Sequence, residues 1–91
     1  MHTISRIRWT DQAIEHLARH HVTPEEVEEA CFNGEPLIRS GRDGLHYVLG
    51  QTGDGRYLFI VVQEMRPGEV RIVTGREMDM KERSYYRRRG K

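Results

Sequence analysis

Histidine, arginine and tyrosine side chains occur at positions from which they could together cleave RNA. His20 stands near the end of a helical pattern, whereas Arg76, Arg83 and Tyr86 lie close to the C-terminus. An imidazole with a pKa near neutrality can take the proton of a 2′-hydroxyl or give one to the leaving oxygen, and guanidinium groups can stabilise charge that develops on phosphorus. These four residues are the candidate catalytic set. The same residue types occur on most small protein surfaces, so they do not by themselves distinguish a nuclease from a binding surface.

The chain also carries residues that suit contacts with RNA. Basic side chains can neutralise phosphates, and tyrosines on a basic helix can stack against bases or donate a hydrogen bond. The central strands supply one further cation. The candidate RNA-binding residues are Arg56, Lys81, Tyr85, Arg87 and Arg88.

Other kinds of catalytic site find little support in the sequence. It contains no Walker loop, no zinc-type spacing of Cys and His, and no nucleophile elbow. His16 and His20 are spaced i, i+4 and could share a metal, but no third ligand is evident. Cys31 is most simply a small core residue. We therefore expect neither a metal nor a cofactor.

Arg76 stands where a strand is expected to give way to a helix. The alternation over 70–74 is typical of a strand, and Asp79 followed three residues later by Glu82 is a capping-box pattern. A guanidinium at such a junction can stand exposed with its fork held by the strand behind it, which suits a phosphate or a carboxylate. The alternative, equally favoured, is an ion pair between Arg76 and Glu77 or a neighbouring acid.

Two helices are expected in the N-terminal half. Thr23-Pro24-Glu25-Glu26 combines an N-cap, a proline at the first helical position and a capping box, which predicts a helix that ends at Asn33-Gly34. Before it, Trp9-Thr10 indicates the start of a first helix, with an inner face formed by Ile14, Leu17, Ala18 and His21. By this phase His21 is a core residue, while His20 lies at the edge of that face and is the better functional candidate. Residues 1–8 could form a short strand or a loosely attached arm.

After Pro36 the pattern changes to strands separated by turns. Segments at 37–40, 45–50, 56–64 and 70–74 are joined by stretches rich in turn-forming residues, which predicts sequential antiparallel hairpins. The run at 57–62 is apolar on both faces and is therefore expected at the centre of the sheet. The expected fold is α+β, with two N-terminal helices, an antiparallel sheet of three or four strands and a C-terminal helix, in one domain spanning 1–91.

The chain of 91 residues has a net charge of only +1, but its charges are unevenly distributed. Between Trp9 and Glu35 seven acids face one base, whereas between Arg66 and Lys91 nine bases face four acids. A basic end of this kind can attract a polyanion such as RNA, although solvated helix faces have the same composition. With a single cysteine, no signal peptide and no apolar run of membrane length, we expect a cytoplasmic protein that does not contact a membrane.

Several motifs follow one another in a characteristic order along nearly the whole chain. They are Trp9-Thr10-Asp11, Arg19-His20-His21-Val22-Thr23-Pro24-Glu25-Glu26, Gly55-Arg56-Tyr57-Leu58, Arg71-Ile72-Val73-Thr74-Gly75-Arg76, Lys81-Glu82-Arg83 and Tyr86. This order resembles the BrnT family, the ribonuclease toxins of BrnT/BrnA toxin–antitoxin pairs, which are related in fold to the RelE-type toxins. Each motif is only moderately specific, and the order carries the resemblance.

The resemblance implies the toxin of a type II toxin–antitoxin system, a metal-independent endoribonuclease that inhibits translation. It also implies a cognate antitoxin with a ribbon-helix-helix DNA-binding domain, so that operator DNA would be contacted only through the antitoxin. The family's histidine falls on His20 and its strand-end arginine on Arg76. The Glu-Arg of its last helix falls on Glu82-Arg83, and the tyrosine that follows falls on Tyr86.

Three features depart from the family pattern. His21 stands in place of the usual glycine, the interval from Trp9 to His20 is one residue shorter, and Glu77 stands where a base is common. The middle of the chain, including Asn33-Gly34-Glu35-Pro36 and Gly75-Arg76-Glu77-Met78, also resembles a neighbouring group of small uncharacterised domains of the same general fold. A non-catalytic module that holds RNA or a protein on the same surface is therefore the alternative function. A regulatory domain that forms a homodimer through its sheet is a third.

Overall fold

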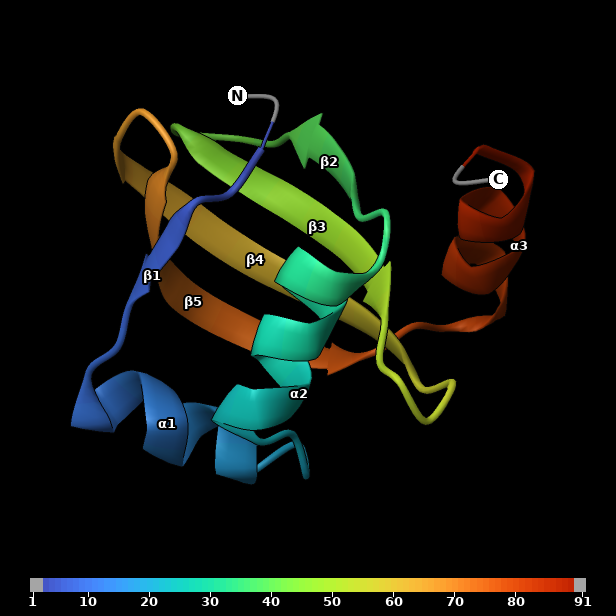
Figure 1. The fold of residues 1–91 in the computed structure, drawn as a ribbon, viewed down its shortest axis with the longest axis horizontal. Coiled ribbons are helices and arrows are strands. Elements are labelled where there is room, and N and C mark those ends of the chain that lie inside the picture. Colours follow the sequence, from blue (N-terminus) through green and yellow to red (C-terminus); the bar gives the residue numbers. More distant parts are fainter. Residues whose placement is uncertain (1–2, 90–91) are drawn as a thin grey trace.

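The computed structural model describes residues 3–89, which form a five-stranded sheet with helices packed on it (Figure 1). This arrangement confirms the α+β class predicted from the sequence. No helix in the described range is long and apolar enough to cross a membrane. In chain order the elements are β1 (Arg6–Arg8), α1 (Asp11–Ala18), α2 (Pro24–Glu28), the π-helical turn η1 (Glu29–Asn33), β2 (Leu37–Ser40), β3 (Leu45–Gln51), β4 (Tyr57–Arg66), β5 (Glu69–Glu77) and α3 (Met80–Arg89).

The sheet is mixed rather than purely antiparallel, with the strand order β1-β5-β4-β3-β2. β2 to β5 form the predicted antiparallel meander. β1 adds a fifth strand parallel to β5, in which Ile7 pairs with Val70 and the Ser5 and Arg6 amides donate to the Gly68 carbonyl at 2.8 and 3.1 Å. The expectation of three or four antiparallel strands is therefore wrong. A strand of only three residues has little periodicity, and its partner lies at the other end of the chain.

One face of the sheet packs on α1, α2 and η1 and forms the main core. Alternate residues of β4, namely Leu58, Ile60 and Val62, are fully buried in one cluster with Leu17 of α1 and Val27 of α2. Figure 1 shows α1 and α2 lying across this face, well apart from α3. The apolar period of β4 thus sets which side of the sheet the two N-terminal helices cover.

Two glycines allow helix and sheet to approach closely on this face. A Cβ atom at Gly50 of β3 would lie 2.5 Å from the carbonyl oxygen of Ala30 in η1. One at Gly75 of β5 would lie 2.9 Å from a methyl carbon of Leu17. Both separations are shorter than real carbon contacts, so a larger residue at either position would push the helix away from the strand.

α1 presents a different face to the sheet from the one expected. Its buried residues are Ala13 and Leu17, whereas 37% of the surface of Ile14 is exposed. His21 is also exposed and adopts φ of 60°, so its assignment to the core is wrong. The physical reason is that α1 ends at Ala18 and the chain then turns through a left-handed residue, after which the helical phase no longer applies.

The helix starts predicted from capping residues are confirmed. Thr10 Oγ1 accepts a hydrogen bond of 3.0 Å from the Ala13 amide. Thr23 and Glu26 form the reciprocal capping box, in which each side chain accepts from the backbone amide of the other at 3.1 and 3.0 Å. These local bonds satisfy amides that a helix start would otherwise leave without partners.

The other face of the sheet is aromatic and only partly covered. Tyr57 and Phe59 alternate with the buried residues of β4 and so face away from α1 and α2. The ring of Tyr47 on β3 lies beside Phe59, with centroids 5.4 Å apart. α3 packs against this face through Tyr86, which is only 5% exposed. A second, smaller cluster therefore joins α3 to the aromatic residues of the sheet.

Candidate nucleic-acid interface

α3 begins at a capping box and then presents its bases at helical spacing. The Glu82 amide donates to Asp79 Oδ1 at 2.8 Å, and the Asp79 amide donates to Glu82 Oε1 at 2.9 Å. Arg83 and Arg87 follow with a spacing of i, i+4, which places both side chains on the same side of the helix. The start of α3, predicted from Asp79 and Glu82, is thus confirmed, and it determines where the following arginines point.

Arg83 and Arg87 both lie over the ring of Tyr57. Their guanidinium carbons are 4.6 and 5.4 Å from the ring centroid, and Arg87 Nε donates to the Tyr57 hydroxyl at 3.4 Å. The ring of Tyr86 meets Tyr57 edge to face with centroids 6.0 Å apart. These four residues, here called the Tyr57 cluster, combine two cations with the half-buried ring of Tyr57 and the buried ring of Tyr86. Such a combination suits both the phosphates and the bases of a single strand of nucleic acid.

The two tyrosines of the cluster differ in acidity because their surroundings differ. The hydrogen bond from Arg87 lowers the pKa of Tyr57, and the charges of Arg87 and Arg83 act in the same direction. Burial raises the pKa of Tyr86, with smaller contributions from Tyr57 and Glu35. Tyr57 is therefore the phenol that can more readily exchange a proton, while Tyr86 remains a neutral hydrogen-bond donor.

The guanidinium of Arg76 is held by a carboxylate of α3. Its two terminal nitrogens donate to the two carboxylate oxygens of Glu82 at 2.8 and 3.0 Å, and one also donates to the Glu77 carbonyl at 3.0 Å. The same group lies 4.6 Å above the ring of Phe59. The hydrogen bond and charge of Glu82 raise the pKa of Arg76. The sequence left open a phosphate contact or an ion pair, and in this structure the fork is occupied by Glu82.

Arg39 forms a third pairing of arginine with an aromatic residue. Its Nε donates to the Tyr85 hydroxyl at 2.7 Å, and its guanidinium carbon lies 5.7 Å from the same ring. Next to this pair is a groove of about 380 Å³ on the open sheet face. Its lining residues are Arg39, Tyr47, Leu49, Phe59, Lys81, Glu82 and Tyr85.

Two predicted RNA contacts on α3 lie at its exposed surface. Lys81 is exposed at the rim of the groove. Arg88 is also exposed and donates to Ser84 Oγ at 2.9 Å. Tyr85 and Arg87 also lie on α3, so this helix carries most of the predicted RNA-binding residues.

His20 lies outside this assembly. It is exposed just past the end of α1, and its ring centroid is 5.6 Å from that of His16, whose Nε2 lies 3.0 Å from Thr74 Oγ1. Within residues 3–89, no hydrogen bond, ion pair or ring contact joins His20 to Arg76 or to Arg83. Arg83 and Tyr86 thus belong to the Tyr57 cluster and Arg76 is bonded to Glu82, whereas His20 makes no contact with them in the described residues.

Arg56 connects three segments instead of facing outward as a free cation. Its NH1 donates to the His21 carbonyl at 2.7 Å and to Glu26 at 2.8 Å, and its Nε donates to Glu77 at 2.8 Å. The hydrogen bond to Glu77 is the main cause of the raised pKa of Arg56. These bonds give Arg56 a structural role, and a contact with RNA stays a prediction for it.

Sequence reasoning missed Tyr57, Phe59 and Arg39 as members of a functional surface. The composition of the run 57–62 predicts only a central strand that is apolar on both faces. The available signal was the alternation within that run, because Tyr57 and Phe59 share one face with Tyr47 on the neighbouring strand. In the described part of the chain, no group of three or more His, Cys, Asp or Glu side chains could hold a metal ion.

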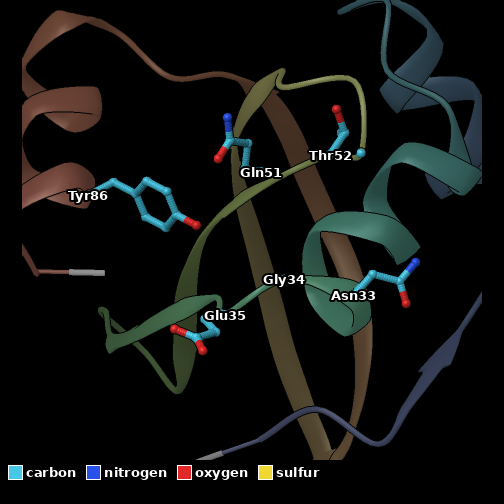
Figure 2. Close-up of a pocket in the computed structure, with 7 residues that line it drawn as sticks. Asn33, Gly34, Glu35, Gln51, Thr52 and Tyr86 are labelled. Carbon is cyan, nitrogen blue, oxygen red and sulfur yellow. The ribbon is translucent and has the colours of Figure 1, made fainter. Parts of the chain in front are cut away.

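A polar pocket of about 360 Å³ adjoins the Tyr57 cluster (Figure 2). It lies between the end of η1, the turn that follows β3 and helix α3. Figure 2 shows the Tyr86 hydroxyl directed into the space between Gln51 and the loop that carries Glu35. Its lining residues are Asn33, Gly34, Glu35, Gln51, Thr52, Gly53 and Tyr86.

Comparisons with protein-family models, with curated proteins and with solved structures found no match. Membership of the BrnT family therefore stays a prediction from the order of motifs.

Proposed function

We propose that the α3 surface binds single-stranded RNA and that the protein cleaves the bound strand. The observation that carries this proposal is the Tyr57 cluster, in which Arg83 and Arg87 lie 4.6 and 5.4 Å from the centroid of the Tyr57 ring. Guanidinium groups attract phosphates, and aromatic rings stack on bases of any sequence. A duplex offers its bases only at groove edges, so the partly exposed ring of Tyr57 favours a single strand.

Cleavage requires a proton acceptor, a proton donor and stabilisation of charge on the phosphate. In the proposed reaction the 2′-oxygen attacks phosphorus as its proton passes to a base, and the bond to the 5′-oxygen breaks as that oxygen gains a proton. Tyr57 is the best-placed group to exchange a proton, because Arg87 lowers its pKa and Arg83 lies beside it. The two guanidinium groups would stabilise the additional negative charge of the transition state.

The family resemblance assigns the proton transfer to His20 instead. For that assignment the bound strand would have to reach from Arg83 and Arg87 to the turn after α1, which Arg56 joins to Glu77 through its bond to the His21 carbonyl. Two variants separate the assignments. Tyr57→Phe keeps the ring but removes the hydroxyl, and His20→Ala removes the imidazole from an exposed position.

We expect Tyr57→Phe to slow cleavage of a single-stranded RNA by about 10²- to 10⁴-fold, the usual contribution of a general acid or base. Binding of a 2′-O-methyl strand, which cannot be cleaved, should stay unchanged. Gel analysis of labelled RNA measures the cleavage rate, and fluorescence anisotropy measures the affinity for the 2′-O-methyl strand. Full cleavage by Tyr57→Phe together with loss in His20→Ala would move the reaction to the histidine.

The RNA-binding step is tested by the double variant Arg83→Ala/Arg87→Ala. Because each phosphate contact on a single strand contributes about 0.7 to the slope of log K against log salt, this slope should fall by about 1.4. The matched control is Arg6→Ala/Arg42→Ala, which removes two exposed arginines on β1 and in the β2–β3 turn. An equal fall of this slope in both double variants would mean that RNA binding depends only on net charge, and it would contradict a site at α3.

A toxin acting on cellular RNA is the biological setting that the proposal fits. Induced expression in a bacterial host should then arrest growth and degrade RNA, and the Arg83→Ala/Arg87→Ala variant should do neither. The antitoxin with a ribbon-helix-helix domain belongs to the same proposal and rests on the resemblance. Growth without arrest, in cells that contain folded protein and intact RNA, would contradict the toxin assignment.

The second candidate function is an RNA-binding module without chemistry. The observation in its favour is the bidentate pair between Arg76 and Glu82, which occupies the arginine expected at the phosphate, while His20 lies elsewhere. A purified protein that binds RNA with a steep salt dependence and leaves it intact over hours would support this function over cleavage.

A further inference from the structure

We infer that the pocket beside Tyr86 is a subsite for a guanine base of the bound RNA. This inference rests on the proposed RNA binding and adds a base preference to it. The pocket volume of about 360 Å³ falls within the range of small-molecule sites, which begins at about 300 Å³. Its lining is rich in hydrogen-bonding groups, so it suits a polar, flat ligand better than an apolar one.

The pocket is continuous with the Tyr57 cluster, where the phosphate would bind. Tyr86 belongs to both, because its ring meets that of Tyr57 at 6.0 Å and its hydroxyl lines the pocket. Gln51 pairs with Tyr57 across β3 and β4 and is one of the groups that lower the pKa of Tyr57. A nucleotide whose phosphate is bound by Arg83 and Arg87 therefore has the pocket next to it for its base.

The pattern of donors and acceptors matches the Watson–Crick edge of guanine. Burial raises the pKa of Tyr86, so its hydroxyl keeps its proton and can donate to a carbonyl such as O6. Glu35, close enough to contribute to that rise, offers two carboxylate oxygens that can accept from N1–H and from the N2 amino group. Adenine and cytosine present one donor on this edge, and uracil presents a single N–H between two carbonyls, so only guanine can use both carboxylate oxygens.

Glu35 also differs from the neighbouring acids Glu29, Glu77 and Glu82, which are bonded to the Gly53 amide, to Arg56 and to Arg76 respectively. A carboxylate near the Tyr57 cluster repels phosphates and lowers the affinity for RNA unless it makes a compensating contact. Glu35 is exposed on the loop between η1 and β2, next to Gly34 and Pro36, and so stands free to meet a ligand. Hydrogen bonds from N1–H and from the N2 amino group of guanine to the Glu35 carboxylate would supply that contact.

The other polar groups of the pocket hold its shape. Gln51 Nε2 donates to the Gly55 carbonyl at 3.3 Å, which leaves the side-chain oxygen of Gln51 as an acceptor. The Gly53 amide donates to Glu29 Oε1 at 2.9 Å and so ties the turn after β3 to η1. Thr52 is buried and closes the turn through a bond of 3.0 Å from the Arg56 amide to its hydroxyl oxygen. The pocket walls are thus fixed before any ligand binds.

The test compares four short 2′-O-methyl RNA strands that differ only in one central base, G, A, C or U. Fluorescence anisotropy should show the wild-type protein binding the G strand about 5- to 100-fold more tightly than the others, as for a bidentate base contact. Glu35→Gln replaces one carboxylate oxygen by an amino group that faces the guanine donors. This variant should bind all four strands within about twofold of one another. The matched control, Glu25→Gln on the exposed surface of α2, removes the same charge and should keep the preference.

The outcomes separate this inference from the proposal on which it rests. Salt-dependent binding of all four strands without a preference, or a preference that survives in Glu35→Gln, overturns the guanine subsite and leaves RNA binding standing. The absence of binding to any strand overturns both. A preference for another base that Glu35→Gln abolishes would keep the pocket as a subsite but contradict guanine. Thermal melts followed by circular dichroism establish that both variants are folded.

Discussion

At the level of single residues, the arginines divide according to the partners that they find. Arg56 has a side chain only 23% exposed and is bonded to Glu26, Glu77 and the His21 carbonyl, so its charge is used within the fold. Arg83 and Arg87 lie instead on aromatic rings at the surface, where a phosphate can reach them. Residue type alone does not separate these roles, because both kinds of arginine look alike in the sequence.

Arg56→Ala is expected to lower the free energy of unfolding by about 1–2 kcal/mol, because it removes charge-assisted bonds that remain partly exposed to solvent. Arg56→Lys should recover only part of this, since an ammonium group lacks the planar fork that reaches several acceptors. Urea denaturation measures the change. If Arg56 instead contacts RNA, its loss would weaken RNA binding in protein that is still as stable as the wild type.

Glu26 makes the stability of the protein depend on pH. Burial acts to raise its pKa, but hydrogen bonds from Thr23 and Arg56 outweigh burial and lower it from the usual 4.5. A carboxylate whose pKa is lower in the folded state stabilises the protein above the unfolded value of 4.5, and this stabilisation is lost as the pH falls through the folded pKa. Glu26→Gln keeps a capping side chain and should flatten the loss of stability below about pH 4.5, measured by urea denaturation across a pH series. An unchanged pH profile would contradict this role.

At the level of elements, the contact between η1 and β3 determines how the N-terminal helices sit on the sheet. η1 is a π-helical turn that continues α2, and its Ala30 carbonyl lies directly over Gly50. α3 is held differently, mainly by Tyr86 and Met78 against the aromatic face. The two kinds of packing explain why one face of the sheet is a tight core and the other a surface with pockets.

Gly50→Ala should destabilise the protein by about 1–3 kcal/mol, because its Cβ would lie 2.5 Å from a backbone oxygen that cannot move away cheaply. Gly34→Ala is the matched control, since its Cβ would meet only the Gln51 carbonyl oxygen at 3.6 Å, an ordinary contact. Chemical denaturation of both variants gives the comparison. Equal stabilities would mean that η1 can shift away from β3 at little cost.

At the level of the whole molecule, the sheet separates an inner core from the surface on which α3 lies. The core cysteine, Cys31, is 4% exposed, and burial together with the charge of Glu28 raises its thiol pKa to about 12. The bases of α3 lie on the opposite side, where they meet solvent. A chain with a net charge of only +1 can thus attract a polyanion through the side that carries the bases of α3.

Because the thiolate is the reactive form, native Cys31 should resist alkylation by iodoacetamide at pH 8. Its reaction rate in increasing urea should follow the fraction of unfolded protein, so that it reports on opening of the whole core. Mass spectrometry of quenched samples measures the modification. Rapid labelling in the absence of urea would show that the core opens locally around η1.

Local patterns were sufficient to predict the features that depend on neighbouring residues. The helix starts at Thr10, Thr23 and Asp79 followed from capping side chains that act within one turn of the chain. The antiparallel meander from β2 to β5 followed from alternation and turn residues in the same way. Because these interactions join residues that are close together in the chain, they can be predicted from the sequence alone.

The pairings between distant segments became visible only in the folded chain. β1 finds a parallel partner in β5, and Tyr57 receives Arg83 and Arg87 from a helix that begins more than twenty residues later. His20, placed near Arg76 by residue chemistry and by the resemblance, has its ring beside that of His16 instead, and within the described residues no hydrogen bond or ion pair joins it to Arg76. Such contacts depend on how the faces of the sheet are covered, and that follows from packing of the whole chain rather than from any short stretch of it.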